Sequence, residues 1–544
     1  MRQKKFRYPV DTASFQGIRE DGKVYVDKTE YVYNLVSNYK YVFLARPRRF
    51  GKSLMCNTLN AYFSAQKELF EGLKIMELEK EWKKHPVLHF TMSGLKNLKV
   101  IEAKSVLESF LRDYEAIYGS DPKSITPGNR FRGLIRRAHE QTGQKAVVIL
   151  DEYDSPILQL MYQPEQLAEM RSLLREFYQV LKDEDNNLRF VFITGVTKFS
   201  QLSIFSELNN LRQISMLDEY SGICGITQNE LDTFLRPCIE EYAENMGVTT
   251  DEAYALLKKN YDGYHFSRRS EDVYAPFSLL RALDDITTDY YWFESGTMSS
   301  LIEHLKHFDI KDALEYDGVD VSDDEFNISC ENAPTPLPLL YQSGYLSIDK
   351  YNPIRKVYTL HFPNLEVRSG MVNGLMPYIL NRKLSENNSL VLKMFDAIYA
   401  GNISDALVAL RAYIAKIPYD IITKEEWEDK ESRESFYKLL IYMVFSILQT
   451  RVDTEVKSIL GRADVVIQTE NDVFVLELKV DKSVDEALAQ IESKDYAIQY
   501  TADGRKITKC GITISTEARN IVHWKAVSES GEVVDEQEFR IDNS

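Results

Sequence analysis

The segment YVFLARPRRFGKSL, residues 41–54, constrains the fold more than any other part of the chain. Residues 41–45 have the composition of a buried strand, and the residues after Gly51 have the apolar spacing of a helix. Between them, Gly51-Lys52-Ser53 matches the end of the pattern G-x-x-x-x-G-K-[ST], whose turn directs backbone N–H groups at phosphate oxygens. Arg46 stands where the first glycine of that pattern belongs. The segment alone is therefore compatible with a phosphate loop or with a basic surface cluster.

In a phosphate loop, the last residues of this segment have separate tasks. Lys52 would neutralise charge on the β- and γ-phosphates, and Ser53 would give its hydroxyl to Mg²⁺. Gly51 would let the backbone approach the phosphates closely, and a proline early in the loop pre-sets a bend. The other residues expected at the nucleotide are Arg46, Pro47, Arg48, Arg49, Phe50 and Leu54.

Three further apolar runs predict that the strand at 41–45 belongs to a parallel sheet covered by helices. These runs are residues 86–92, 146–151 and 189–195. Amphipathic helices are predicted between them, most clearly at 100–118 and 165–184, where apolar residues recur at three- and four-residue spacing.

Paired carboxylates stand at the end of the run AVVILD, where open α/β sheets bind ligands. We expect Asp151 to hold Mg²⁺ through water and Glu152 to orient or deprotonate an attacking water. The next strand ends in Thr194-Gly195-Val196-Thr197, and a hydroxyl such as that of Thr194 would there sense the γ-phosphate. An acidic strand end is common by itself, but the order loop, acidic pair, polar strand end favours a nucleotide site.

The chain has 544 residues, which is too long for a single core. We expect three domains: a P-loop α/β domain at 1–220, a mostly helical middle region at 221–430, and a small α/β domain at 431–544. The many aromatic residues of the middle region are assigned to packing. The last domain is predicted to contain a helix at 434–449, strands at 451–457, 463–468 and 472–479, a helix at 483–500 and a strand at 509–515.

The last domain carries a second pattern of acidic and basic residues. Glu477 and Lys479 alternate along a predicted strand and therefore face the same side. A hairpin turn at TEND would pair that strand with the one that begins near Asp464. Two carboxylates and a lysine suit metal-assisted phosphodiester hydrolysis, in which the acids hold Mg²⁺ and the lysine orients water or shields charge. The alternative for any isolated E-x-K is a solvated strand face with a cross-strand charge pair.

Further polar residues around this pattern could take part in the site. Glu434 and Glu455 are further candidate acids or merely solvated or capping carboxylates, and Arg462 would contact phosphate or pair with an acid. Gln490 and Tyr496 are six residues apart, so on one helix they would not share a face. We assign both to orientation or packing.

Charge and cysteine content limit the setting. A formal charge of -17 makes a nucleic-acid-coating surface improbable, so any nucleic-acid contact must be local. The five cysteines show no C-x-x-C spacing, which disfavours a disulfide scaffold and a zinc site. No signal-peptide pattern and no run of 18 apolar residues occurs, so we expect a cytoplasmic protein without a membrane span. A homo-oligomer is compatible with the sequence.

Five motifs resemble those of the bacterial AAA-ATPase-like proteins: YVDKTEYV, RPRRFGKSL, ILDEYDSPI, FITGVTKFS and YDGYHFS. The P-R-R-F-G-K-S form of the loop is usual in that family, so the resemblance implies that Lys52 and Ser53 bind ATP and Mg²⁺ and that Asp151 and Glu152 form the Walker B pair. The family usually has Asn where this chain has Ala275.

GRAD followed by ELK and a helix resembles the PD-(D/E)xK nuclease superfamily, in the branch found at the C-terminus of these same proteins. That resemblance implies a restriction-endonuclease-like fold, metal ligation by Asp464 and Glu477, and catalysis by Lys479.

Two classes of function follow. The first is an ATP-hydrolysing protein coupled to a Mg²⁺-dependent nuclease that acts on nucleic acid, with DNA as the first expectation. The second is a nucleotide switch whose C-terminal domain recognises nucleic acid or protein without cutting it. A protein that binds ATP without hydrolysing it is a third alternative, against which Glu152 argues.

Overall fold

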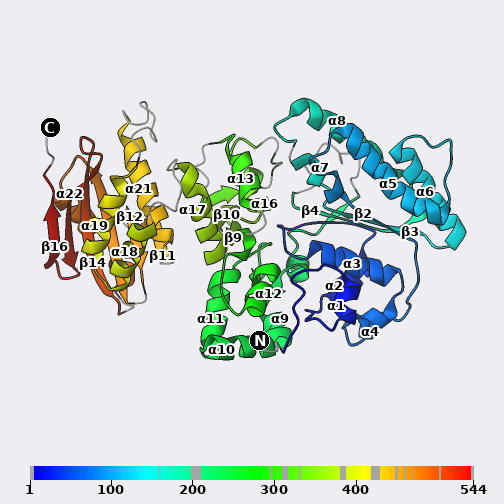
Figure 1. Ribbon diagram of the computed structural model, residues 1–544, viewed down its shortest axis with the longest axis horizontal. Coiled ribbons are helices and arrows are strands. Elements are labelled where there is room, and N and C mark those ends of the chain that lie inside the picture. The colour runs from blue at the N-terminus through cyan, green and yellow to red at the C-terminus, as the bar shows by residue number, and fades with distance from the viewer. Residues whose placement is uncertain are drawn as a thin grey trace. The chain divides into compact units, whose positions relative to one another are not determined.

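The structure is a computed structural model that describes residues 5–540 apart from 159, 198–209, 294–296, 309–315, 327, 329, 331–332, 380–387, 418–428, 448–450, 459–460, 470 and 502–503. The chain forms two compact units (Figure 1). The first consists of Met1–Thr297 and Glu315–Val367, and the second of Met298–Leu314 and Arg368–Ser544. The domain boundaries near 220 and 430 stay predictions.

The first unit contains the predicted parallel sheet. Its strands are β1 (Tyr41–Ala45), β2 (Val87–Thr91), β3 (Ala146–Asp151), β4 (Leu188–Gly195) and the short β5 (Arg212–Gln213). They are all parallel, in the order β2-β3-β4-β1-β5. Because β4 lies between β1 and β3, the loop after β1, the acids at the end of β3 and the polar end of β4 meet at one edge of the sheet.

Helices cover both faces of this sheet. Figure 1 shows α1 to α4 on one face and α5 to α8 on the other. They are α1 (Phe15–Glu20), α2 (Thr29–Asn38), α3 (Lys52–Phe63), α4 (Ile75–Leu78), α5 (Val100–Tyr118), α6 (Pro127–Thr142), α7 (Ser155–Leu158) and α8 (Pro164–Asp183). The helices predicted at 100–118 and 165–184 are confirmed as α5 and, within one residue, α8.

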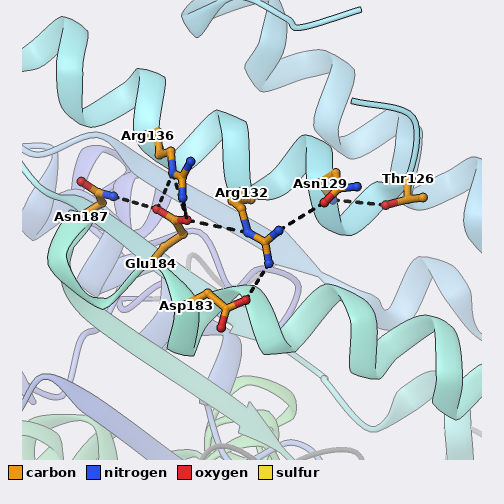
Figure 2. Close-up of polar contacts among 7 residues, drawn as sticks. All are labelled: Thr126, Asn129, Arg132, Arg136, Asp183, Glu184 and Asn187. Carbon is orange, nitrogen blue, oxygen red and sulfur yellow. Dashed lines mark hydrogen bonds and ion pairs between the residues drawn. The ribbon is translucent and has the colours of Figure 1, made fainter. Parts of the chain in front are cut away.

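The core on the α5–α8 face is aromatic. Phe131 of α6 stacks on Phe177 of α8 with ring centroids 4.5 Å apart, and both belong to one buried cluster with strands β1 to β4. A polar network then joins the ends of these two helices (Figure 2). Arg136 and Asn187 hold the buried carboxylate of Glu184 at 2.7 Å each. The network fixes α6 against the C-terminal end of α8.

The rest of the first unit is mostly helical, as predicted, but it also contains small sheets. Strands β8 (Val319–Ser322), β9 (Ser347–Asn352) and β10 (Val357–His361) form an antiparallel sheet in the order β8-β10-β9. These strands are short and largely polar, which is why their sequence gives little strand signal. The other elements are β6 (Ile226–Thr227), β7 (Val273–Tyr274), α9 (Gln228–Glu230), α10 (Arg236–Met246), α11 (Thr250–Tyr261), α12 (Pro276–Asp285), α15 (Asp323–Phe326) and α16 (Leu337–Gln342).

The second unit contains a six-stranded mixed sheet in the order β11-β12-β13-β14-β15-β16. Its strands are β11 (Arg451–Ser458), β12 (Gly461–Gln468), β13 (Asp472–Val480), β14 (Lys506–Ser515), β15 (Asn520–Ser528) and β16 (Val533–Glu538). Only β13 and β14 pair in parallel, across the connection that contains α22 (Val484–Ser493). The predicted α-β-β-β-α-β order is confirmed, whereas β15 and β16 were not predicted.

The remaining helices are α13 (Thr297–Leu305), α17 (Leu365–Ile379), α18 (Asn388–Tyr399), α19 (Ile403–Ile414) and α21 (Lys430–Ile447). Short turns of other helix types are η1 (Lys67–Phe70), η2 (Met92–Leu95), η3 (Asp185–Asn187), η5 (Asp218–Ile223), η6 (Leu231–Leu235), η7 (Tyr291–Phe293) and η10 (Ile498–Tyr500). No helix in the described part of the chain is both long enough and apolar enough to cross a membrane.

One helix prediction is wrong. The helix expected at 483–500 ends at Ser493, and Asp495 then adopts a left-handed φ of 49°. The N–H of Tyr496 donates to the carbonyl of Ile491, so the chain turns back on the end of α22. This turn changes which side chains meet in the site of the second unit.

Candidate active sites

The loop between β1 and α3 has the backbone of a tight turn. Arg49 and Gly51 both adopt left-handed conformations, with φ of 65° and 86°. A Cβ at Gly51 would meet no atom within 4 Å, so here the glycine is required by its φ and not by a close contact. Lys52 begins α3 and Ser53 follows in its first turn, which leaves N–H groups of the helix start facing the loop.

The Lys52 ammonium rests on the loop itself. It donates to the carbonyls of Arg46 at 3.0 Å and Pro47 at 2.8 Å. Burial lowers the pKa of Lys52, and the nearby charge of Asp151 opposes that shift. The lysine is thus held by neutral acceptors beside an acidic pair.

Arg46 has a different surrounding from the one expected of a nucleotide ligand. Its buried guanidinium stacks 4.1 Å from the ring centroid of Phe266 and donates to four backbone carbonyls. These acceptors are Ala45 and Ser215, at 3.0 and 2.7 Å, and Tyr220 and Ser221, at 3.1 and 3.3 Å. Burial lowers the pKa of Arg46 to about 10. The side chain ties the loop to the segment after β5, and nucleotide contact by Arg46 stays a prediction.

The other loop residues divide between packing and charge. Phe50 packs edge-on against Tyr264 and Phe266 of the YDGYHFS motif, with centroids 4.7 and 5.3 Å away. Arg49 donates to the carbonyl of Tyr291 and covers a phenylalanine ring. Arg48 is half-buried, and its charge works against the raised pKa of Glu152. The charge of Arg48 thus favours the ionised form of Glu152.

The acidic pair at the end of β3 has features suited to chemistry. Asp151 is buried, and its Oδ1 has no hydrogen-bond partner among the described residues. Glu152 adopts a left-handed φ of 52°, which is a strained conformation for a glutamate. Burial and the neighbouring Asp151 raise the pKa of Glu152. An acid with a raised pKa beside an open carboxylate oxygen is suited to handle a proton next to a metal ion.

The polar end of β4 is organised by an acid that the sequence reasoning did not assign. Asp154 Oδ2 accepts hydrogen bonds from the N–H groups of Val196 and Thr197, at 2.9 and 2.6 Å, and from the Thr197 hydroxyl at 2.7 Å. The Thr194 hydroxyl donates to the carbonyl of Leu44 at 2.8 Å. Thr194 therefore bridges β4 to β1, and its contact with a γ-phosphate stays a prediction.

An apolar cavity of about 80 Å³ opens beside the loop. Gly51 and Leu54 form one wall, and residues before β1 form another. The third wall comes from the segment around Ile226 and from α12. Leu54 thus lines this cavity, and its contact with a nucleotide stays a prediction.

In the second unit, the predicted hairpin brings Asp464 and Glu477 together. Strands β12 and β13 pair with Val465 opposite Leu476, so one step further places the two acids level. Asp464 Oδ2 accepts a hydrogen bond from the N–H of Leu478 at 2.8 Å. Both acids are nearly buried, with exposed fractions of 6% and 1%. The pair is consequently a site below the surface and not a solvated strand face.

A chain of hydrogen bonds positions Lys479. Its ammonium lies 2.9 Å from Glu477 Oε1 and donates to Gln490 Oε1 at 2.7 Å. Gln490 Nε2 in turn donates to the hydroxyl of Tyr496 at 3.1 Å. The early end of α22 makes this possible, because Tyr496 lies past the helix and folds back toward Gln490. Both residues act as orienting groups in this geometry.

The site also contains a lysine that the sequence reasoning missed. Lys438 of α21 forms an ion pair with Asp464 Oδ1 at 2.7 Å. The one sequence feature that could have identified Lys438 is its position four residues after the candidate acid Glu434, which places both on the same face of the helix. Glu434 is half-buried on α21. Glu455 and Arg462 lie in β11 and β12, but their side chains are outside the described part of the structure.

Each site contains one buried carboxylate oxygen that accepts no hydrogen bond from the described residues. Glu477 Oε2, like Asp151 Oδ1, is buried without a partner among the described residues. Burial and Asp464 raise the pKa of Glu477 to about 7. No three acidic, histidine or cysteine side chains gather at one point within the described ranges. This donor set fits Mg²⁺, which commonly takes one or two carboxylates and keeps several waters.

The fold and the two sites define a P-loop ATPase-like domain and a nuclease-like domain in one chain. The family model described as "Predicted AAA-ATPase" matches residues 9–205, and the model of the PD-(D/E)XK nuclease superfamily matches residues 432–524. The chain is 33% identical over 534 residues to "Uncharacterized protein in vnfD 5'region" of Azotobacter chroococcum mcd 1, covering 95% of this chain and 98% of that relative. The protein belongs to the family of predicted AAA-ATPases that carry a C-terminal PD-(D/E)XK nuclease superfamily domain.

Proposed function

We propose that the protein hydrolyses ATP at the loop of the first unit and cleaves nucleic acid at the Asp464 and Glu477 pair of the second. The observation that carries the proposal is the pair of buried, unpartnered carboxylate oxygens, Asp151 Oδ1 and Glu477 Oε2. A buried charge without a partner is costly, and a functional ligand is the usual reason to keep one.

At the first site, Lys52 and the N–H groups of the loop bind the phosphates, with Ser53 and Asp151 holding Mg²⁺. Glu152 orients the attacking water and takes its proton, for which its raised pKa suits it. The apolar cavity beside Leu54 receives the base, since apolar walls suit a purine face.

Binding measurements with ATP and with inorganic triphosphate test this assignment, read together with phosphate release. ATP is expected to bind more tightly than triphosphate because only ATP fills the cavity. Equal affinities for ATP and triphosphate would show that the base does not bind in the cavity. Absence of phosphate release would show that the site binds ATP without hydrolysing it.

At the second site, Asp464 and Glu477 hold the divalent cation. A cation bound there supplies a water of lowered pKa and neutralises charge on the scissile phosphate. Lys479, oriented by Gln490, directs the attacking water or offsets the charge that develops on phosphorus. ATP binding or hydrolysis controls this cleavage.

Incubation of the full chain with single-stranded DNA, duplex DNA and RNA, with Mg²⁺ or Mn²⁺ and with or without ATP, tests the nuclease. Metal-dependent cutting of one of these substrates is expected, with a rate that changes when ATP is added. Absence of cutting in every condition would favour a nucleotide switch whose C-terminal unit binds without cleaving.

A further inference from the structure

The Lys438 ammonium occupies a ligand position of the nuclease site. Asp464 has two oxygens, and Oδ2 is held by the backbone N–H of Leu478. The remaining oxygen, Oδ1, is paired with Lys438 at 2.7 Å. A cation held by Asp464 and Glu477 would therefore compete with Lys438 for Asp464, whereas Oε2 of Glu477 is buried without a hydrogen-bond partner among the described residues.

The charges of the site strengthen this competition between Lys438 and a metal ion. The groups that face one another are Asp464, Glu477, Lys438 and Lys479, with Glu434 one turn before Lys438 on α21. The two acids, when ionised, are already balanced by two ammonium groups. A divalent cation added to that set would lie within a few ångströms of Lys438, where repulsion between like charges is strong in a buried setting. Binding of a metal ion at Asp464 would require the ammonium to leave that carboxylate.

Lys438 can leave without losing all contact with water. Its side chain is 25% exposed, whereas that of Asp464 is 8% exposed, so the lysine lies toward the rim of the site. An ammonium displaced from a carboxylate at the rim is placed to meet the next anion that enters. For a nuclease, that anion is a phosphate of the nucleic acid.

We propose that Lys438 is an exchangeable cation of this site, which holds Asp464 while the metal is absent and pairs with a substrate phosphate once the metal is bound. The proposal rests on the proposed nuclease function. It makes Lys438 a substrate-binding residue of the reaction and a competitor of the metal.

Calorimetric titration with Mn²⁺ tests the first half of the proposal. At a fixed pH above the pKa of Glu477, Lys438→Met is expected to bind Mn²⁺ about tenfold more tightly than the wild type, because a charge-assisted contact no longer competes. Lys438→Arg restores the positive charge and is expected to bind Mn²⁺ with nearly wild-type affinity. An unchanged or weaker affinity in Lys438→Met would overturn the proposal.

A matched control is available in the same unit. Lys525 is 23% exposed, pairs with the exposed Asp485 at 3.3 Å and lies 3.7 Å from Glu536, so Lys525→Met removes an ammonium of similar exposure from a place outside the site. Its Mn²⁺ affinity should equal that of the wild type. A gain in Lys525→Met as large as that in Lys438→Met would mean that the effect is one of general charge, and the proposal would fall.

Asp464→Asn separates this proposal from the proposed function. If Asp464→Asn binds Mn²⁺ as the wild type does, the metal site itself is wrongly assigned. If Asp464→Asn loses Mn²⁺ while Lys438→Met matches the wild type, the nuclease site stands and only the exchange is wrong.

The second half concerns substrate. In Ca²⁺, used as a cation that supports binding, Lys438→Met is expected to bind a DNA oligonucleotide about tenfold more weakly than Lys525→Met does. Equal oligonucleotide affinities in the two variants would remove the phosphate contact.

Discussion

The two sites keep their lysines in opposite ways. In the first unit, Lys52 rests on the uncharged carbonyls of Arg46 and Pro47, and Asp151 keeps an open oxygen. In the second unit, Lys438 and Lys479 lie directly on the carboxylates of Asp464 and Glu477. Under the proposed function, nucleotide and metal binding at the first site would break no ion pair among the described residues, whereas metal binding at the second site would break the pair of Lys438 and Asp464.

The two sites differ in the free energy needed to move a lysine from its acceptors. A hydrogen bond from an ammonium to an uncharged carbonyl costs less to break than an ion pair. Lys52 could therefore exchange its carbonyl acceptors for a bound anion. An ammonium held by a nearly buried carboxylate is released only in exchange for another cation. We therefore propose different roles for the same residue type: Lys52 would bind phosphate in the first unit, and Lys438 would occupy the place of a metal ion in the second.

The largest expected effect comes from Lys52→Ala. ATP hydrolysis should fall by on the order of a hundredfold or more, because the variant removes a cation aimed at the charge of the transferred phosphoryl group. Release of phosphate from ATP measures this loss. Mn²⁺ binding at the second site should stay unchanged, and a loss of both would contradict the separation of the two sites.

Arg46→Ala should cost about 3 kcal/mol or more of the free energy of unfolding of the first unit, because four backbone carbonyls lose a charged donor. Urea unfolding measures the change. Arg48→Ala is the control, since it removes the neighbouring arginine and leaves those four contacts in place. Equal stabilities of the two variants would show that Arg46 does not hold the loop.

Glu366 is expected to make the folding stability of the first unit depend on pH. Its buried carboxyl accepts the N–H of Trp292 at 2.7 Å, and burial raises its pKa from an ordinary 4.5 to about 8. Because the folded state binds this proton more tightly than the unfolded state does, the protonated carboxyl contributes to stability in full below the unfolded pKa of about 4.5. That contribution is lost as the pH rises to the folded pKa of about 8. Stability should fall by about 2 to 3 kcal/mol between pH 6 and pH 9.

Glu366→Gln should remove most of that slope, because glutamine keeps the acceptor oxygen and cannot ionise. Thermal unfolding of both proteins across the pH range measures it. Parallel slopes for the wild type and the variant would assign the dependence to another group.

Gln490→Ala is expected to have a smaller effect than the substitutions above. The variant frees Lys479 from its acceptor and leaves both carboxylates in place, so cleavage should slow about tenfold while Mn²⁺ affinity stays near that of the wild type. Tyr496→Phe acts one step further away and should slow cleavage less. A loss of Mn²⁺ binding in Gln490→Ala would mean that the glutamine holds the acids and not the lysine.

Much of this arrangement could be predicted from the sequence where one local pattern sets one element. The apolar runs before Arg46 and up to Asp151 are strands β1 and β3, and strict alternation around Glu477 fixes the face of β13. The hairpin register then follows from a short turn, which is why Asp464 and Glu477 could be paired in advance.

The rest depended on distant contacts or on single turns. Three of the four acceptors of Arg46 lie more than 160 residues away in the sequence, so no local pattern predicted the burial of this side chain. Lys438 meets Asp464 because α21 packs on the sheet, which spacing alone does not reveal. The approach of Tyr496 to Gln490 required the left-handed turn at Asp495, where the helical pattern suggested continuation.

The proposed function places an ATPase site and a separate metal-dependent nuclease site in one chain. Cleavage of the preferred nucleic acid by Asp464→Asn, measured beside ATP hydrolysis in the same preparation, tests this separation. Asp464→Asn is expected to lose metal-dependent cutting and to keep wild-type phosphate release. Cutting by Asp464→Asn at the wild-type rate would show that the nuclease site is wrongly assigned.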